Sequence, residues 1–303
     1  MRIGVDMGGT KIELVALADD GELLSRERIA TPRGDYEGTV RAIAGLVAAH
    51  EARLGQRASV GVGIPGSLDP TSGLVQNANS TWLIGKPFDR DLGKAMDRTV
   101  RMANDANCFA LSEAVDGAGA GKRVVFGVIL GTGCGSGIVV GRQVIEGLNR
   151  AAGEWGHMPL PWQTEGEYPG PICWCGQVGC LETWISGSGL ERDHEAHAGE
   201  ELAASEIVAR AGEGEPKAAS SLKRYEDRLA RALAVIVNLV DPDIVVLGGG
   251  MSNVASLYER VPPLIAPHAF ARVVRTPIVK NRHGDSSGVR GAAWLWPEST
   301  AAR

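Results

Sequence analysis

The chain has 303 residues, of which 44% are hydrophobic and 22% charged, and its formal net charge at neutral pH is −5. These values are typical of a globular protein that forms one large domain or two lobes of ordinary size. The sequence contains no block of Lys and Arg and no apolar run long enough to span a bilayer, so neither nucleic acid nor a membrane is an expected partner. It opens on a strand-like segment rather than a signal peptide, and we expect a cytoplasmic location.

Short apolar runs separated by turns rich in Gly or Asp-Gly open the chain and predict strands. Apolar residues at helical spacing then predict a long helix, and a further strand leads into a second helix. The expected elements are strands at 3–7, 12–17, 23–29, 59–64 and 100–103, and helices at 36–54 and 105–115. Asn104 is the expected N-cap of the second helix.

A second series of the same kind begins near residue 123. A segment rich in Gly, Pro and Cys interrupts it and shows little periodicity. The expected elements are strands at 124–130, 137–140 and 243–247, a long amphipathic helix marked by apolar residues from 222 to 240, and a closing helix at 288–295. Two mixed α/β lobes with a ligand cleft between them are the simplest architecture for this pattern.

The segment Asp6-Met7-Gly8-Gly9-Thr10-Lys11 follows the first expected strand. Its two glycines allow a sharp turn and bring backbone N–H groups close to phosphate oxygens. Thr10 adds a hydroxyl, Lys11 a positive charge, and Asp6 a carboxylate for Mg²⁺ or its waters. The segment predicts a phosphate-binding turn; an ordinary hairpin with solvated charges is the alternative.

The second half of the chain repeats this chemistry in residues 130–137, which read Leu-Gly-Thr-Gly-Cys-Gly-Ser-Gly. Two such turns in one chain indicate that a polyphosphate is held from both lobes. A third run, Gly248-Gly249-Gly250, follows the strand expected at 243–247 and would let an adenine or ribose lie flat on the backbone. By itself such a run is only a turn in most proteins.

The pair Asn104-Asp105 stands where an expected strand meets an expected helix. A carboxylate at this junction is able to accept the proton of a sugar hydroxyl that attacks phosphorus, which is the general-base role in phosphoryl transfer. Taken without context, the pair is more often a helix cap.

Three of the five cysteines lie within eight residues, in Cys173-x-Cys175-x4-Cys180, and Glu154-Trp155-Gly156-His157 precedes them. Three thiolates and one imidazole complete a tetrahedral Zn²⁺ site with no open position, which predicts a structural rather than a catalytic metal. A redox-active cysteine cluster is the alternative. The remaining two cysteines, Cys108 and Cys134, are expected in the core.

Together these segments resemble the ROK family (repressors, open reading frames and kinases) of the actin-like ATPase superfamily. The resemblance covers essentially the whole chain, and the Cys segment joined to Glu-x-Gly-His is its most specific part. It rests on residues 6–11, 63–66, 104–105, 130–137, 154–157, 173–182 and 247–250.

The resemblance implies the actin-like, ribonuclease H-like α/β fold with two lobes and an interlobe cleft. The N-terminal lobe would span 1–117 and be closed by a C-terminal helix at about 286–298. The larger C-terminal lobe would span 118–285 and carry the zinc-binding segment 153–182. A homodimer is also implied.

The resemblance also implies roles for single residues, with Asp105 as the catalytic base. The implied sugar-binding residues are Gly66, Asn79, Asn104, Asp105, Glu154, His157 and Glu182. The implied ATP- and Mg²⁺-binding residues are Asp6, Gly8, Gly9, Thr10, Lys11, Thr132, Gly133, Gly249 and Gly250. His157, Cys173, Cys175 and Cys180 would bind the zinc ion, and His157 would also touch the sugar.

Within the family, the stretch Asn77–Trp82, together with Trp162 and Trp184, looks most like bacterial fructokinases that also accept mannose. The indole of Trp82 would fill the room that an N-acetyl group needs, so we expect D-fructose as the substrate. The alternatives are N-acetylglucosamine, N-acetylmannosamine or glucose.

Two functions of other classes are disfavoured. A sugar-responsive regulator is disfavoured because the Asp-x-Gly-Gly-Thr strand begins at residue 2, which leaves no room for a helix-turn-helix domain. A sugar-binding pseudokinase is disfavoured by the intact Asp105.

Overall fold

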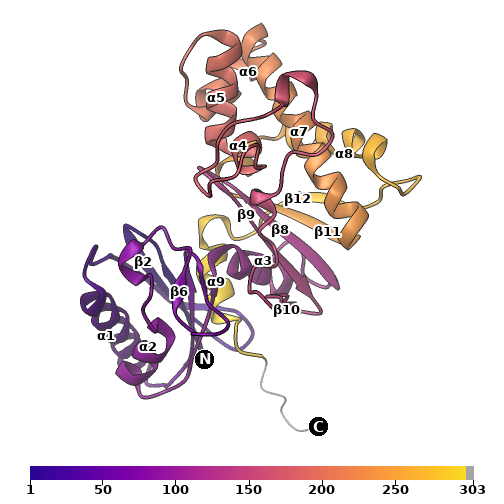
Figure 1. Ribbon diagram of the computed structural model, residues 1–303. Coiled ribbons are helices and arrows are strands. Elements are labelled where there is room, and N and C mark those ends of the chain that lie inside the picture. Colours follow the sequence, from indigo (N-terminus) through magenta and orange to yellow (C-terminus); the bar gives the residue numbers. More distant parts are fainter. Residues whose placement is uncertain (298–303) are drawn as a thin grey trace. The chain divides into compact units, whose positions relative to one another are not determined.

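The computed structural model describes residues 1–297, which form two compact units (Figure 1). The first unit combines residues 1–121, 137–152 and the end of the chain from 285, and the second combines residues 122–136 and 153–284. The segment 137–152, which was expected in the C-terminal lobe, belongs to the first unit. Among the helices of residues 1–297, none has the length and apolar character needed to cross a membrane.

The first unit is built on a five-stranded sheet with the strand order β3-β2-β1-β4-β7. The first three strands form an antiparallel meander, whereas β4 and β7 run parallel to β1. The bounds are β1 Arg2–Met7, β2 Lys11–Leu17, β3 Leu23–Ala30, β4 Ser59–Ile64 and β7 Val100–Asn104. A separate two-stranded ribbon pairs β5 Ser67–Leu68 with β6 Val75–Gln76.

Side chains of successive strand residues alternate between the two faces of this sheet. Ile3, Val5, Val60 and Val62 are buried in the core that also contains residues of two helices, α1 Tyr36–Leu54 and α2 Phe88–Met96. Asp35 caps the N-terminus of α1, since its side chain accepts from the Gly38 N–H. Gly55, which has a left-handed backbone, caps the C-terminus.

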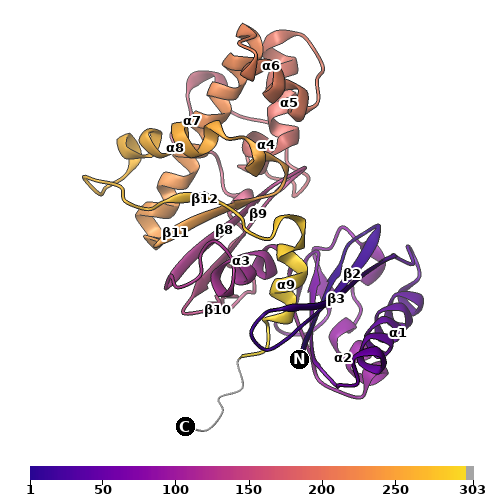
Figure 2. The ribbon, with the colours of Figure 1, turned by 180° about the vertical axis from the view of Figure 1, so that it is seen from behind.

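The opposite face of the sheet carries glycines where other strands carry large side chains. A Cβ on Gly4 would lie 2.0 Å from the Val289 carbonyl oxygen, and one on Gly61 would lie 1.9 Å from that of Ala292. Both contacts are with α9 Ser287–Ala293, which packs beside α3 Asp105–Val115 (Figure 2). The two glycines therefore let a helix from the end of the chain lie directly on β1 and β4.

A second five-stranded sheet has the strand order β10-β9-β8-β11-β12. The strand β11 runs parallel to both β8 and β12, and β9 pairs with β10 as an antiparallel hairpin. The bounds are β8 Val124–Leu130, β9 Cys134–Val140, β10 Gln143–Val144, β11 Ile244–Gly248 and β12 Ile278–Lys280.

The helices of the second unit gather around the long helix α7, which packs against α5, α6 and α8 (Figure 1). Their bounds are α4 Glu182–Ile185, α5 Gly187–Ala198, α6 Ala204–Gly212, α7 Pro216–Val240 and α8 Ser256–Ile265. Pro216 at the first turn of α7 and the capping side chain of Glu215 fix where this helix begins.

Most of the expected elements are confirmed with bounds that differ by one or two residues, and the long helix begins six residues earlier than expected. The helices α2, α5, α6 and α8 were not predicted, since α2 and α5 contain glycines and α8 contains Pro262 and Pro263. The closing helix ends at Ala293, and the last residue of its expected range, 298, lies outside the described residues.

A buried group of ion pairs holds residues 161–167 against α7. Glu167 accepts from Arg228 at 2.8 Å and from Arg231 at 2.7 Å, and Arg228 also donates to Asp193 on α5 at 2.6 Å. Burial alone would raise the pKa of Glu167, but the hydrogen bonds from Arg231 and Arg228 outweigh it and lower the pKa to about 2. This group therefore anchors the segment that leads into the cysteine cluster.

We expect Glu167→Gln to lower the free energy of unfolding by about 1.5–3 kcal/mol at pH 7, because two buried guanidinium groups each lose one of the two carboxylates that they contact. The stability that a carboxyl of lowered pKa provides is present above pH 4.5 and is lost as the pH falls toward 2. The difference between wild type and variant should therefore shrink over that window in urea unfolding. Glu206→Gln removes an exposed i,i+4 pair with Arg210 and should cost less than about 1 kcal/mol; equal losses would contradict the anchor.

Candidate active site and metal centre

Asp6 lies on the glycine face of the first sheet, one residue before the end of β1. A Cβ on Gly63 would lie 3.6 Å from its Oδ1, and one on Gly288 would lie 3.9 Å from its Cγ. Burial raises the pKa of Asp6 to about 7, and the negative charges of Asp105 and Glu13 add to this effect. The two carboxylates of Asp6 and Asp105 are thus close enough to interact, which is the arrangement that a divalent cation would stabilise.

Asn104 and Asp105 occupy the junction of β7 and α3. The Asn104 Oδ1 accepts from the Ala106 and Asn107 N–H groups, and its amide nitrogen donates to the Gly66 carbonyl oxygen at 3.2 Å. Asn104 is therefore the expected helix cap, and it also fixes the turn that follows β4. Asp105 is exposed at the first position of α3, and its Oδ1 accepts from the Ala106 N–H at 2.7 Å.

The turn between β1 and β2 is held by its own backbone and by β3. The Gly8 N–H donates to the Lys11 carbonyl oxygen at 2.9 Å, and the Thr31 hydroxyl donates to the Gly8 carbonyl oxygen at 2.8 Å. Thr10 and Lys11 are exposed at the tip. The predicted residues of this turn thus present hydroxyl, ammonium and backbone groups beside the carboxylate of Asp6.

Gly66 has a φ of +88°, and a Cβ there would lie 2.4 Å from the Gln76 carbonyl oxygen, so only glycine fits. Asn79 is exposed on the segment that follows β6. Ser80 lies on the same segment, and a Cβ on Gly9 would lie 3.7 Å from its hydroxyl. The structure therefore brings the phosphate turn and the Asn79 segment together within the first unit.

The contacts of Trp82 give no support to the role that the sequence suggested for it. Its indole is partly buried against the core of the first unit, and its Nε1 donates to the Thr39 hydroxyl on α1 at 3.3 Å. Trp184 is buried beneath the guanidinium of Arg228, and Trp162 lies against His268. The argument that the Trp82 indole excludes an N-acetyl group therefore loses its basis, because the ring is committed to packing.

In the second unit, two glycine turns lie at the same edge of the sheet, because β8 and β11 are parallel and end side by side. The Gly131 N–H donates to the Gly133 carbonyl oxygen at 3.0 Å and leaves Thr132 exposed. A Cβ on Gly249 would lie 2.5 Å from the Leu130 carbonyl oxygen, so this glycine permits a close approach of the two strand ends. The carboxyl ends of parallel strands are the usual place for a nucleotide.

Glu182, at the start of α4, connects one of these turns with the cysteine cluster. Its Oε2 accepts from the Cys134 N–H at 2.9 Å, and its Oε1 accepts from the Trp174 indole at 2.6 Å. A Cβ on Gly133 would lie 2.5 Å from Oε2, so the carboxylate needs glycine at this position. The predicted sugar-binding residue is thus fixed in place by the backbone of the Gly131–Gly133 turn.

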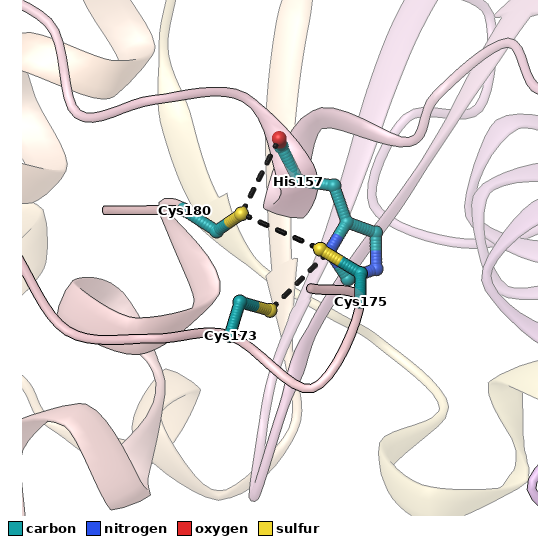
Figure 3. A group of neighbouring side chains, drawn as sticks. All are labelled: His157, Cys173, Cys175 and Cys180. Atoms are coloured by element: carbon teal, nitrogen blue, oxygen red, sulfur yellow. Dashed lines mark hydrogen bonds between the residues drawn. The ribbon is translucent and has the colours of Figure 1, made fainter. Parts of the chain in front are cut away.

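The side chains of His157, Cys173, Cys175 and Cys180 point toward one another (Figure 3). One ligand atom from each residue lies within 4.8 Å of all the others. The Cys173 Sγ is 3.7 Å from the His157 Nδ1, and the Cys175 Sγ is 3.7 Å from the Cys180 Sγ. Zinc–sulfur bonds of about 2.3 Å in a tetrahedron place ligand atoms about 3.8 Å apart, so these four residues fit a zinc ion.

A compact turn-rich segment, residues 172–180, positions the cysteines and is called the knuckle. Ile172 pairs with Val178 across the turn, and Pro159 pairs with Cys180. Gly176 sits at the tip with a φ of +89°, which other residues rarely adopt. The convergence of one imidazole and three thiol groups favours a metal over the redox alternative.

The predicted site residues form two groups. The first unit holds Asp6, Gly8, Gly9, Thr10, Lys11, Gly66, Asn79, Asn104 and Asp105. The second unit holds Thr132, Gly133, Glu154, His157, Glu182, Gly249, Gly250 and the three cysteines. Glu154 is exposed directly before the short helix that carries His157.

Comparisons with known proteins identify the family of this chain. The model of the ROK family matches residues 2–299. This chain belongs to the ROK family. It is 44% identical to the N-acetyl-D-glucosamine kinase of Vibrio cholerae, over 97% of this chain and 99% of that protein, and 41% identical to that of Yersinia pseudotuberculosis, over 97% and 98%.

Solved structures support the same assignment. This ROK protein is 32% identical to the ROK hexokinase of Thermus thermophilus, with a TM-score of 0.86 over 97% of each chain. It is 28% identical to a ROK family glucokinase of Streptomyces griseus, solved with glucose and AMPPNP, with a TM-score of 0.77 over 97% and 98%. The expected fold class is therefore confirmed.

Two elements of this ROK protein's site were missed from the sequence. The N-terminus of α5 lies against the Gly131–Gly133 turn, because the Gly187 N–H donates to the Gly131 carbonyl oxygen at 2.7 Å. The segment Ser186-Gly187-Ser188-Gly189, with Ser186 as the cap, was the available signal. The second missed element is Trp174, which stands between Cys173 and Cys175 and gives no signal of its own in the sequence.

We expect Asp6→Asn to stabilise the fold by about 1–2 kcal/mol at pH 8, because it removes a carboxylate whose ionisation is opposed by burial and by Asp105. A carboxyl of raised pKa costs stability as the pH rises from its ordinary value of 3.8 to about 7, and the cost is constant above that. Thermal melts should therefore show a larger gain at pH 8 than at pH 5. Asp20→Asn, an exposed turn residue, should change stability by less than about 0.5 kcal/mol; an equal gain for Asp6→Asn at both pH values would contradict the raised pKa.

Proposed function

We propose that this ROK protein is an ATP-dependent hexose kinase and that its preferred substrate is N-acetylglucosamine. The observation that carries the proposal is the 41–44% identity to N-acetyl-D-glucosamine kinases over 97% of the chain. The likeness to a hexokinase and a glucokinase supports the broader activity. Fructose, the substrate expected from the sequence, has no comparable support, because the Trp82 indole is packed against α1.

The residues of the first unit supply the proposed chemistry. Asp105 takes the proton of the primary hydroxyl as that oxygen attacks the γ-phosphorus. Asp6 holds Mg²⁺ or its waters, and the positive charge offsets the burial that raises its pKa. The N–H groups of the turn from Gly8 to Lys11 and the Lys11 ammonium bind phosphate oxygens. ATP and Mg²⁺ supply the phosphoryl group and part of the charge neutralisation.

The residues of the second unit bind the sugar and the nucleotide in this proposal. Thr132, Gly133 and the glycines after β11 contact the nucleotide, and Glu154 and Glu182 accept from sugar hydroxyls. His157 has two tasks: its Nδ1 faces the thiolates, so coordination there leaves the Nε2 N–H free to donate to the sugar. The zinc ion, when bound, holds one wall of the sugar site rigid. The homodimer and the cytoplasmic location remain predictions.

We expect ADP release by the purified protein to depend on sugar, with the highest kcat/KM for N-acetylglucosamine. N-Acetylmannosamine, glucose, mannose and fructose are the comparison substrates, and a sample without sugar is the blank. A preference for fructose would restore the expectation from the sequence and overturn the substrate proposal. An absence of release with every sugar would contradict the kinase itself and favour a sugar-binding protein.

We expect Asp105→Asn to lower kcat by about 10²–10⁴-fold with little change in the KM for ATP, because the amide cannot accept the hydroxyl proton. Asp20→Asn, an exposed carboxylate in the turn before β3, is the matched control and should retain full activity. Comparable activity in Asp105→Asn would show that another group is the base.

We expect metal analysis to find one zinc ion per chain, and Cys180→Ser to lose it and lower the melting temperature. Cys134→Ala removes a buried thiol outside the cluster and should retain the metal. Zinc retained by Cys180→Ser, or a wild-type protein that takes up no zinc when it is supplied, would refute the site.

A further inference from the structure

Trp174 lies between two of the proposed metal ligands, yet its side chain is 73% exposed. Its ring and the ring of His157 meet in a T-shaped contact, with centroids 5.1 Å apart and planes at 82°. Its Nε1 donates to the Glu182 Oε1 at 2.6 Å. The metal cluster does not require this indole, because the proposed ligands on either side of Trp174 are Cys173 and Cys175.

Both oxygens of Glu182 have donors. The donor to Oε2 is the Cys134 N–H, a backbone group at the first residue of β9. The short contact of Oε1 is with the Trp174 indole, a side chain with two rotatable bonds and most of its surface in water, whereas the Cys173 Sγ lies farther away at 3.9 Å. A sugar hydroxyl that takes the place of a donor at Glu182 therefore displaces the indole more readily than the backbone.

We propose that Trp174 gates the sugar site: its indole N–H occupies the Glu182 Oε1 until a sugar hydroxyl displaces it. This inference rests on the proposed function, in which Glu182 accepts from the substrate. Where the sugar hydroxyl takes the place of the indole N–H, one hydrogen bond to the carboxylate is exchanged for another, so the indole weakens sugar binding without taking part in phosphoryl transfer. The contact with His157 brings the ring back when the site empties.

Trp174→Phe tests the gate because phenylalanine retains a ring beside His157 but has no N–H. In the zinc-loaded full chain, we expect the KM for the sugar to fall about fivefold while kcat changes by less than about twofold. The zinc content should equal that of the wild type. Trp174→Leu, which removes both the ring and the donor, should lower the KM in the same way.

Trp162→Phe is the matched control, since Trp162 is also an exposed tryptophan of the second unit but lies against His268 instead of Glu182. Its KM should equal that of the wild type. Addition of sugar without ATP should change the tryptophan fluorescence of the wild type and of Trp162→Phe, and Trp174→Phe should lack most of that change.

An unchanged or higher KM in both Trp174 variants would overturn the gate, because the indole would then be neutral or would help to bind the sugar. A fluorescence change retained in full by Trp174→Phe would also overturn it. These results differ from a failure of the proposed function, which would appear as a wild-type protein without sugar-dependent ADP release.

Discussion

Parallel strand pairing is the constraint that positions the predicted site residues within each unit. In the first unit, β1, β4 and β7 run in one direction, so the residues that follow them emerge at one edge. This arrangement brings Asp6, the Gly66 turn and the Asn104–Asp105 junction together, although 99 residues of sequence separate Asp6 from Asp105. In the second unit, the parallel pair β8 and β11 does the same for the Gly131–Gly133 turn and Gly249.

The sequence predicted much of this because the signals are local. Short apolar runs that end in glycine define the strands, and the Cys-x-Cys-x4-Cys spacing defines the metal ligands before any contact is known. The helices α5 and α6 were missed because α5 begins with Gly-Ser-Gly, which has a low helix propensity. Both helices pack against α7, and this tertiary contact is not visible in the local sequence. The role of Trp82 was also beyond reach, since only the fold shows that its indole faces Thr39.

The second unit joins its chemistry to its stability through contacts that differ in kind. Glu182 links the knuckle to the Gly131–Gly133 turn by hydrogen bonds, whereas Glu167 links the segment before the knuckle to α7 by buried ion pairs. The first carboxylate is partly exposed, and the second is buried between two guanidinium groups. Two glutamates in adjoining segments thus differ in their access to water, which their surroundings determine.

The glycine face of the first sheet has a consequence for how the protein is made. Gly4 and Gly61 are covered by α9, which follows every strand of both units in the chain. During synthesis, β1 and β4 therefore have a bare face until α9 emerges, whereas the segments of the second unit emerge before it. The second unit is consequently the first able to fold, and a nascent chain released before α9 leaves the Asp6 side of its sheet open to water and to other chains.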